Sequence, residues 1–244
     1  MYQQRLPLPR QIQRSRKMQE AETTDSFPIR INKYLALKKI STRRDADKLV
    51  ANKKVFINGK LAMLGSKVNK NDVVEVKNYK PKECVYFVYH KLIGIETNSP
   101  RSDLFPLGRL DKNSHGLLIL TNDGRITDSL LNPKYFHEKE YVIRTSNKLR
   151  SSFKKKMEAG VNIEGYLTKK CKVKIIDDFT FRIILTEGKK HQIRRMCSAL
   201  FQEIADLKRE RIMNTKLGNL KPGGVRQIKG EELRIFLQSL GLTN

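Results

Sequence analysis

The chain has 244 residues, of which 39% are hydrophobic, and its 50 lysines and arginines against 25 acidic residues give a formal net charge of +25. So basic a chain indicates a polyanionic partner, with nucleic acid the first candidate and an anionic membrane surface the second. No apolar run approaches the ~20 residues of a membrane-spanning helix, and the first 26 residues lack the apolar region of a signal peptide, so we expect a cytoplasmic protein.

Cysteine and histidine usage argues against a metal centre. The three cysteines are widely spaced and odd in number, and the four histidines show no metal-ligand spacing. The chain also lacks a glycine-rich phosphate loop. We therefore expect a mechanism that uses neither a metal nor a cofactor.

The amino-terminal third is expected to consist of a tail and a small domain. Residues 1–26 carry a net charge of +2, show no hydrophobic periodicity and are expected to form a flexible basic tail. Residues 27–80 carry 14 basic and 4 acidic side chains, and their apolar pattern predicts a compact unit.

Four elements are predicted inside this small domain. Helical spacing predicts a first helix near Ile31 and a second that starts at Thr42, whose spacing to Asp45 fits a capping box. The dipeptide Asn58-Gly59 between apolar pairs indicates a hairpin. A further short strand is expected at 73–76.

Basic residues crowd the predicted helix–turn–helix and leave its apolar positions free. A solvated helical face is the commoner fate of such a charge run, but almost no acids balance this one, so RNA contact is favoured. The predicted contact residues are Lys38, Lys39, Arg43, Arg44 and Lys48.

The remainder of the chain, residues 81–244, follows a short linker at 78–82 and mixes strand and helix patterns. Strands are predicted at 84–89, 117–121, 140–145, 171–176, 180–186 and near 211–217, and helices at 125–131, 150–158, 191–200 and 231–240. Many strands with scattered helices indicate an α+β sheet domain.

Two stretches of this larger domain carry residues suited to chemistry. In residues 108–124, Arg109 and Asp111 lie in a loop that leads into an apolar strand, which can hold a carboxylate where a substrate reaches it. From spacing alone, a local ion pair between these two side chains is the simpler interpretation. The second stretch, 138–142, contains Tyr141, which by itself would be a core strand residue.

A third stretch runs from Leu185 to Met196 and ends in a predicted helix. At about 100° per residue, Ile193 and Met196 share its apolar face. Arg194 falls at the border of that face and can reach a cleft from the packed side. Arg195 falls nearly opposite, so it is expected to point to solvent or RNA.

These motifs resemble those of known RNA-modifying enzymes. The run 108–124 resembles the aspartate motif of pseudouridine synthases, in the RsuA/RluB/RluE/RluF family that modifies ribosomal RNA. Residues 29–77 resemble an S4 RNA-binding domain. Residues 168–174 and 211–214 resemble the RluF-like branch of the family in particular.

The resemblance implies a fold and a set of roles. The expected fold is α+β, with a small S4 domain of the αL type at 27–80 followed by a pseudouridine synthase catalytic domain at 81–244 with a mixed, mainly antiparallel sheet. Asp111 would be the catalytic carboxylate, Arg194 its partner, and Tyr141 the ring that packs on the flipped uracil. The residues expected to contact substrate around them are Arg109, Leu185 and Arg195.

The same resemblance implies the substrate. The RluF-like branch acts on a uridine of large-subunit rRNA, and members also modify a tRNA anticodon stem-loop, so an rRNA stem-loop is the expected partner of a monomeric enzyme, with tRNA as a second one. The main alternative is a non-catalytic S4-domain RNA-binding protein acting in ribosome assembly, with a degenerate second domain. A basic DNA- or membrane-binding protein would explain the charge but none of the three stretches.

One stretch departs from the family pattern. Lys91-Leu92-Ile93-Gly94 stands where the family usually has Lys-Pro-x-Gly, and the loop at 96–105 is shorter than expected. Because that loop is expected to grip RNA, the departure bears on the choice of substrate more than on the chemistry.

Overall fold

The computed structural model describes residues 27–38, 40–78 and 83–242. The predicted tail at 1–26, the predicted contact residue Lys39 and most of the predicted linker therefore lie outside the described residues. Within the described ranges, no helix is both long enough and apolar enough to cross a membrane.

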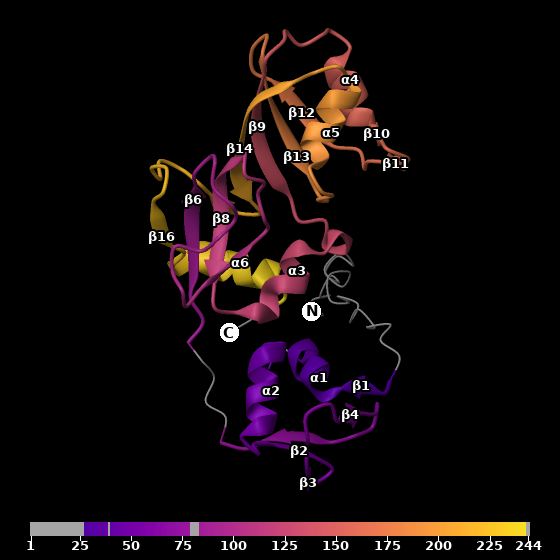
Figure 1. Ribbon diagram of the computed structural model, residues 1–244, viewed down its shortest axis with the longest axis vertical. Helices are drawn as coiled ribbons and strands as arrows, with labels where there is room; N and C mark the ends of the chain where they lie inside the picture. Colours follow the sequence, from indigo (N-terminus) through magenta and orange to yellow (C-terminus); the bar gives the residue numbers. More distant parts are fainter. Residues whose placement is uncertain (1–26, 39, 79–82, 243–244) are drawn as a thin grey trace, which may run out of the picture.

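The amino-terminal domain consists of two short helices packed against small antiparallel sheets (Figure 1). Its elements are β1 (Ile29–Arg30), α1 (Ile31–Leu37), α2 (Arg43–Ala51), β2 (Val55–Ile57), β3 (Lys60–Leu61), β4 (Lys67–Val68) and β5 (Val74–Val76). Buried side chains of this domain, among them Leu35 and Val50, form a core of their own. The predicted hairpin around Asn58-Gly59 is the β2–β3 pair.

Helix α2 begins at the predicted position. Thr42 Oγ1 accepts a hydrogen bond from the backbone N–H of Asp45 (3.1 Å), which satisfies one unpaired donor of the first turn. The Asp45 carboxylate accepts the Thr42 hydroxyl hydrogen (2.9 Å). The predicted N-cap is therefore confirmed. The second hydrogen bond of the predicted capping box joins the two side chains.

The carboxy-terminal domain is built on a nine-stranded sheet with the order β12-β13-β9-β14-β8-β6-β16, to which β15 and β7 add at the sides. Its strands are β6 (Tyr86–Lys91), β7 (Phe105–Leu107), β8 (His115–Thr121), β9 (Lys139–Thr145), β12 (Lys172–Ile175), β13 (Thr180–Leu185), β14 (Ile204–Ile212), β15 (Thr215–Lys216) and β16 (Val225–Gln227). Strands β14 and β8 pair in parallel and the other neighbours are antiparallel. The predicted mixed, mainly antiparallel sheet is confirmed.

Helices cover this sheet on both faces. They are α3 (Thr127–Leu131), α4 (Phe153–Ala159), α5 (Gln192–Ala199) and α6 (Gly230–Ser239), with 3-10 turns η1 (Gly124–Ile126) and η2 (Pro133–Tyr135) and a small hairpin, β10 (Asn162–Ile163) and β11 (Tyr166–Leu167). Side chains alternate along β8, so Leu118 and Leu120 join the core under α4 and α5, whereas Leu117 and Ile119 join the core under α6 (Figure 1).

The central strand β14 lies earlier in the chain than predicted. A strand was expected near 211–217, but β14 begins at Ile204 and ends at Ile212. Five of its nine residues are charged, so apolar periodicity did not indicate the strand. The charges are stabilised inside the sheet, as where the Arg211 Nε donates to Glu140 on β9 (2.6 Å). Several strands of two or three residues were also not predicted, because so short a segment shows no period.

Candidate active site

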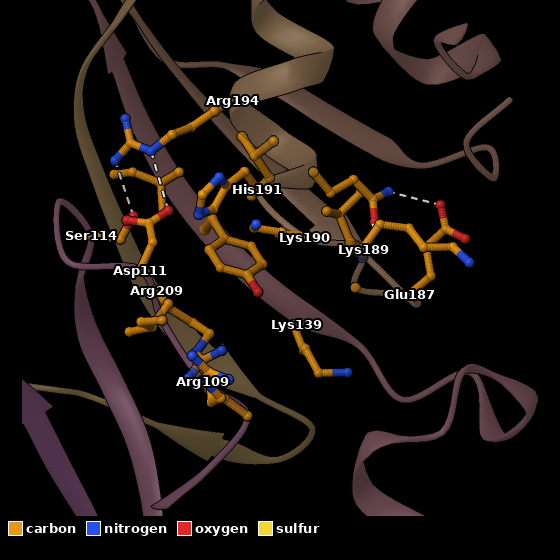
Figure 2. Close-up of a pocket in the computed structure, with 18 of the residues that line it drawn as sticks. Arg109, Asp111, Ser114, Lys139, Glu187, Lys189, Lys190, His191, Arg194 and Arg209 are labelled. Atoms are coloured by element: carbon orange, nitrogen blue, oxygen red, sulfur yellow. Dashed lines mark hydrogen bonds and ion pairs between the residues drawn. The ribbon is translucent and has the colours of Figure 1, made fainter. Parts of the chain in front are cut away.

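A cavity of about 720 Å³ opens in the larger domain where segments distant in sequence meet. Its walls come from the loop before β8, the start of β9, the end of β13, the loop and first turns of α5, and β14 (Figure 2). Five of the residues singled out from the sequence line it: Arg109, Asp111, Tyr141, Leu185 and Arg194. The three sequence segments predicted to carry the chemistry thus line the same cavity.

An ion pair between Asp111 and Arg194 lies on one wall of this cavity. The Arg194 Nε donates to Asp111 Oδ2 at 3.2 Å, and its Nη2 donates to the Ser114 hydroxyl (3.1 Å) (Figure 2). The same Nη2 donates to the Asn113 carbonyl (2.9 Å). The local pair between Arg109 and Asp111 is not formed in the described chain, and Arg109 is exposed. The spacing-based interpretation of this motif was therefore wrong.

The site keeps the Asp111 carboxylate charged. Burial alone would raise the pKa of this carboxyl, but the Ser114 hydroxyl, the Arg194 guanidinium and the positive charge at His191 together hold the pKa below its ordinary value. Asp111 Oδ1 is buried without a hydrogen-bond partner among the described residues. Arg194 thus fixes the carboxylate through one of its two oxygens.

A buried lysine fixes the backbone of the Asp111 loop. Lys91, at the end of β6, is 0% exposed and donates to the carbonyls of Leu92 (2.9 Å), Asp111 (3.1 Å) and Ser114 (2.8 Å). Three carbonyl acceptors compensate for the removal of its ammonium from water. The first residue of the atypical Lys91–Gly94 stretch therefore positions the loop, a role that the sequence analysis did not assign.

Tyr141 lines the cavity next to an arginine on β14. Its side chain is 9% exposed, and the Arg209 guanidinium lies 5.9 Å from the ring centroid. Arg209 is almost fully buried and donates to the carbonyls of Leu117 (2.7 Å) and Gly108. Gly116 is required beside it, because a Cβ there would lie 2.3 Å from the Arg209 carbonyl oxygen.

Comparison with known proteins decides the family. A family model described as RNA pseudouridylate synthase matches residues 68–199, and one described as S4 domain matches residues 29–74. The chain belongs to the RNA pseudouridylate synthase family. It is an isomerase that acts on RNA and carries an S4 RNA-binding domain.

Named relatives and a solved structure agree with this assignment. The chain is 38% identical to the dual-specificity RNA pseudouridine synthase RluF of Escherichia coli K12, over 84% of this chain and 77% of RluF. It is 31% identical to the ribosomal large subunit pseudouridine synthase B of Bacillus subtilis 168, over 84% of this chain and 94% of that protein. A crystal structure of a pseudouridylate synthase superposes with a TM-score of 0.64 at 25% identity, covering 87% of this chain and 99% of that one.

Glu187 anchors the loop before α5, the helix of this synthase that carries Arg194. The carboxylate is 2% exposed and accepts hydrogen bonds from the Tyr166 hydroxyl (2.7 Å), the Gln192 side-chain amide (2.7 Å) and the Lys169 backbone N–H (3.0 Å). It therefore ties the first residue of α5 to the β10–β11 hairpin. Neither its role nor that of Arg209 was found from the sequence.

The other predicted contact residues lie away from the cavity. Arg195 does not point freely to solvent, because it donates to the Glu164 carboxylate (2.7 Å) and the Ile163 carbonyl (3.1 Å) at the β10–β11 hairpin. The predicted contact residues of the S4 domain that the structure describes are exposed; they are Lys38, Arg43, Arg44 and Lys48. Among the described residues, no group of three or more His, Cys, Asp or Glu side chains could hold a metal ion.

Proposed function

We propose that this synthase converts a uridine of large-subunit rRNA to pseudouridine, with Asp111 as the catalytic carboxylate. The observation that carries the proposal is the ionised Asp111 held by Arg194 on the wall of a cavity that also contains Tyr141 and Leu185. The synthase B relative supports an rRNA substrate by its name. A tRNA anticodon stem-loop is included as a second substrate because the sequence resembles the RluF-like branch, whose members are named dual-specificity RNA enzymes.

The reaction sets clear demands on the cavity. The N1–C1′ bond of uridine breaks, the base turns, a C5–C1′ bond forms, and the hydrogen of C5 is replaced by one on N1, so that no atom is gained or lost. The target base must first leave its stack, which costs a few kcal/mol and least in a loop or bulge. A cavity of about 720 Å³ is large enough to receive the extruded nucleoside.

The roles of the lining residues follow from their chemistry. Asp111 acts as an anion, either by attack on the sugar or base or by removal of the C2′ proton, and both routes need the ionised form that its surroundings favour. Arg194 fixes the carboxylate in one geometry. The Tyr141 ring packs on the uracil and its hydroxyl receives the C5 proton, while Leu185 supplies an apolar wall.

Exposed basic residues at the cavity edge and in the S4 domain hold the RNA. Arg109 is exposed at the cavity edge and is placed to grip a phosphate or to fill the space that the base has left. The exposed Arg43 and Arg44 of the S4 domain provide phosphate contacts. We further propose that the enzyme acts as a monomer, and the bacterial RNA-modifying relatives support a cytoplasmic location.

The test is to map pseudouridine in rRNA and tRNA from cells with and without this gene, using carbodiimide treatment and reverse transcription. We expect one large-subunit rRNA stop to disappear in the deletion strain and to return when the wild-type gene is restored. Restoring the Asp111→Asn gene should not bring it back. An unchanged rRNA map in the deletion strain would refute the substrate assignment.

A further inference from the structure

Lys139 is a buried lysine on the cavity wall for which the described protein supplies no counter-ion. It begins β9, is 8% exposed and lies on the same face of the strand as Tyr141. Among the described residues its ammonium has no hydrogen bond or ion pair. In Figure 2 its side chain extends along the cavity and away from the Asp111–Arg194 pair.

The charges around Lys139 are positive. Burial, followed by the positive charge of Arg209 on β14, lowers the pKa of Lys139 to about 8. On the loop before β9, burial and then the charge of Lys139 lower the pKa of His137. The acids of the cavity are engaged elsewhere, Asp111 by Arg194 and Glu187 by Tyr166 and Gln192. The remaining basic side chains of the lining are Arg109, Lys189, Lys190 and His191.

Comparison with Lys91 separates this residue from a structural lysine. Lys91 is more deeply buried, but the fold gives its ammonium three carbonyl acceptors. Lys139 receives none from the described chain, and a largely buried charge without partners on the wall of a cavity destabilises the fold. A ligand that brings a negative charge to Lys139 would offset this cost in stability.

The geometry points to a phosphate-binding role: we propose that Lys139 binds the backbone phosphate next to the target uridine. This inference rests on the proposed function, in which the cavity receives a uridine of RNA. The base and ribose of that nucleotide are neutral, so its negative charge lies on the flanking phosphate. Two residues along a strand span about 7 Å, so a base packed on Tyr141 leaves its phosphate within reach of a lysine side chain.

Mononucleotide binding to the full-length protein tests the proposal. Isothermal titration calorimetry at neutral pH would compare uridine with uridine 3′-monophosphate and uridine 5′-monophosphate, which also identifies the phosphate that is bound. The wild-type protein should prefer one monophosphate over uridine by about tenfold or more, as expected for a charge-assisted contact. Lys139→Met should remove this preference and leave uridine affinity almost unchanged, and Lys139→Arg should retain most of it.

A control variant and the pattern of affinities show which claim a negative result contradicts. Lys174→Met alters an exposed lysine of β12 outside the cavity and should keep the wild-type preference. A wild-type protein that does not distinguish the monophosphates from uridine, or a Lys139→Met variant that still does, would overturn the proposal. An equal loss of affinity for all three probes would assign Lys139 a structural role. Binding is measured without turnover. A protein that is inactive on rRNA but keeps a Lys139-dependent preference would therefore refute the proposed function and leave the phosphate-binding proposal standing.

Discussion

Replacing Lys139 by methionine should stabilise the ligand-free protein. The substitution keeps an unbranched apolar side chain and removes the unpaired charge. In the folded state the pKa of Lys139 falls from 10.5 to about 8. Because one pKa unit corresponds to ~1.36 kcal/mol, holding the ammonium charged in the folded protein costs about 3 kcal/mol at neutral pH. We therefore expect Lys139→Met to raise the free energy of unfolding by up to about 3 kcal/mol.

The pH dependence of this difference has a definite sign. Below pH 8, Lys139 is charged in both the folded and the unfolded states, so the full penalty applies to the wild-type protein. Between pH 8 and 10.5 the folded state has lost a proton that the unfolded state still binds, so wild-type stability gains on the variant as the pH rises. The advantage of Lys139→Met should therefore be constant below pH 8 and shrink above it.

Urea unfolding followed by labelling of Cys197 measures this difference in the right domain. Cys197 is fully buried in the core under α5, so its thiol reacts when the catalytic domain unfolds. Peptide mass spectrometry distinguishes it from the other two cysteines, and Lys174→Met serves as the matched control. A Lys139→Met variant that is less stable than the wild-type protein at pH 7, or an advantage that does not shrink at high pH, would refute the reasoning.

Three further substitutions test residues that position the site or bind RNA. Arg194→Ala should lower turnover and destabilise the catalytic domain by about 1–2 kcal/mol, because it leaves the half-buried Asp111 unpaired; wild-type rates and melting would contradict this. Glu187→Ala removes three hydrogen bonds to a buried carboxylate and should cost about 2–4 kcal/mol, with kcat falling more than RNA affinity; unchanged thermal unfolding would argue against the anchoring role. Changing Arg43 and Arg44 together to alanine should weaken RNA binding at low salt and reduce the slope of log K against log salt by about 2, and an unchanged slope would show that they do not touch RNA.

The resemblance to the family singled out the residues of the cavity, and the local sequence pattern explains where two of them lie. Asp111 lies in a loop ahead of an apolar strand, and Arg194 lies at the border of the apolar face of a helix. Helical geometry therefore predicted that Arg194 reaches the packed side, where the structure places it. The same geometry did not predict the partner of Arg195, because Glu164 belongs to a hairpin of two-residue strands.

The residues that were missed are charged side chains buried in the sheet. Arg209 and Lys139 occupy inward positions of β14 and β9, yet in sequence they are indistinguishable from charges on a solvent-facing strand. The positioning role of Lys91 likewise depends on carbonyls that lie about twenty residues away in the chain. Such positions depend on strand pairing over long sequence separations, which periodicity within one segment cannot supply.

The most direct test of the central claim is tritium release from large-subunit rRNA transcribed with 5-tritiated uridine, comparing the wild-type enzyme with Asp111→Asn. The variant keeps the size of the side chain and removes its charge. We expect no release above the background without enzyme, while RNA affinity stays within about threefold of the wild-type value. An Asp111→Asn enzyme that releases tritium at a rate near that of the wild-type protein would contradict the assignment of the catalytic carboxylate.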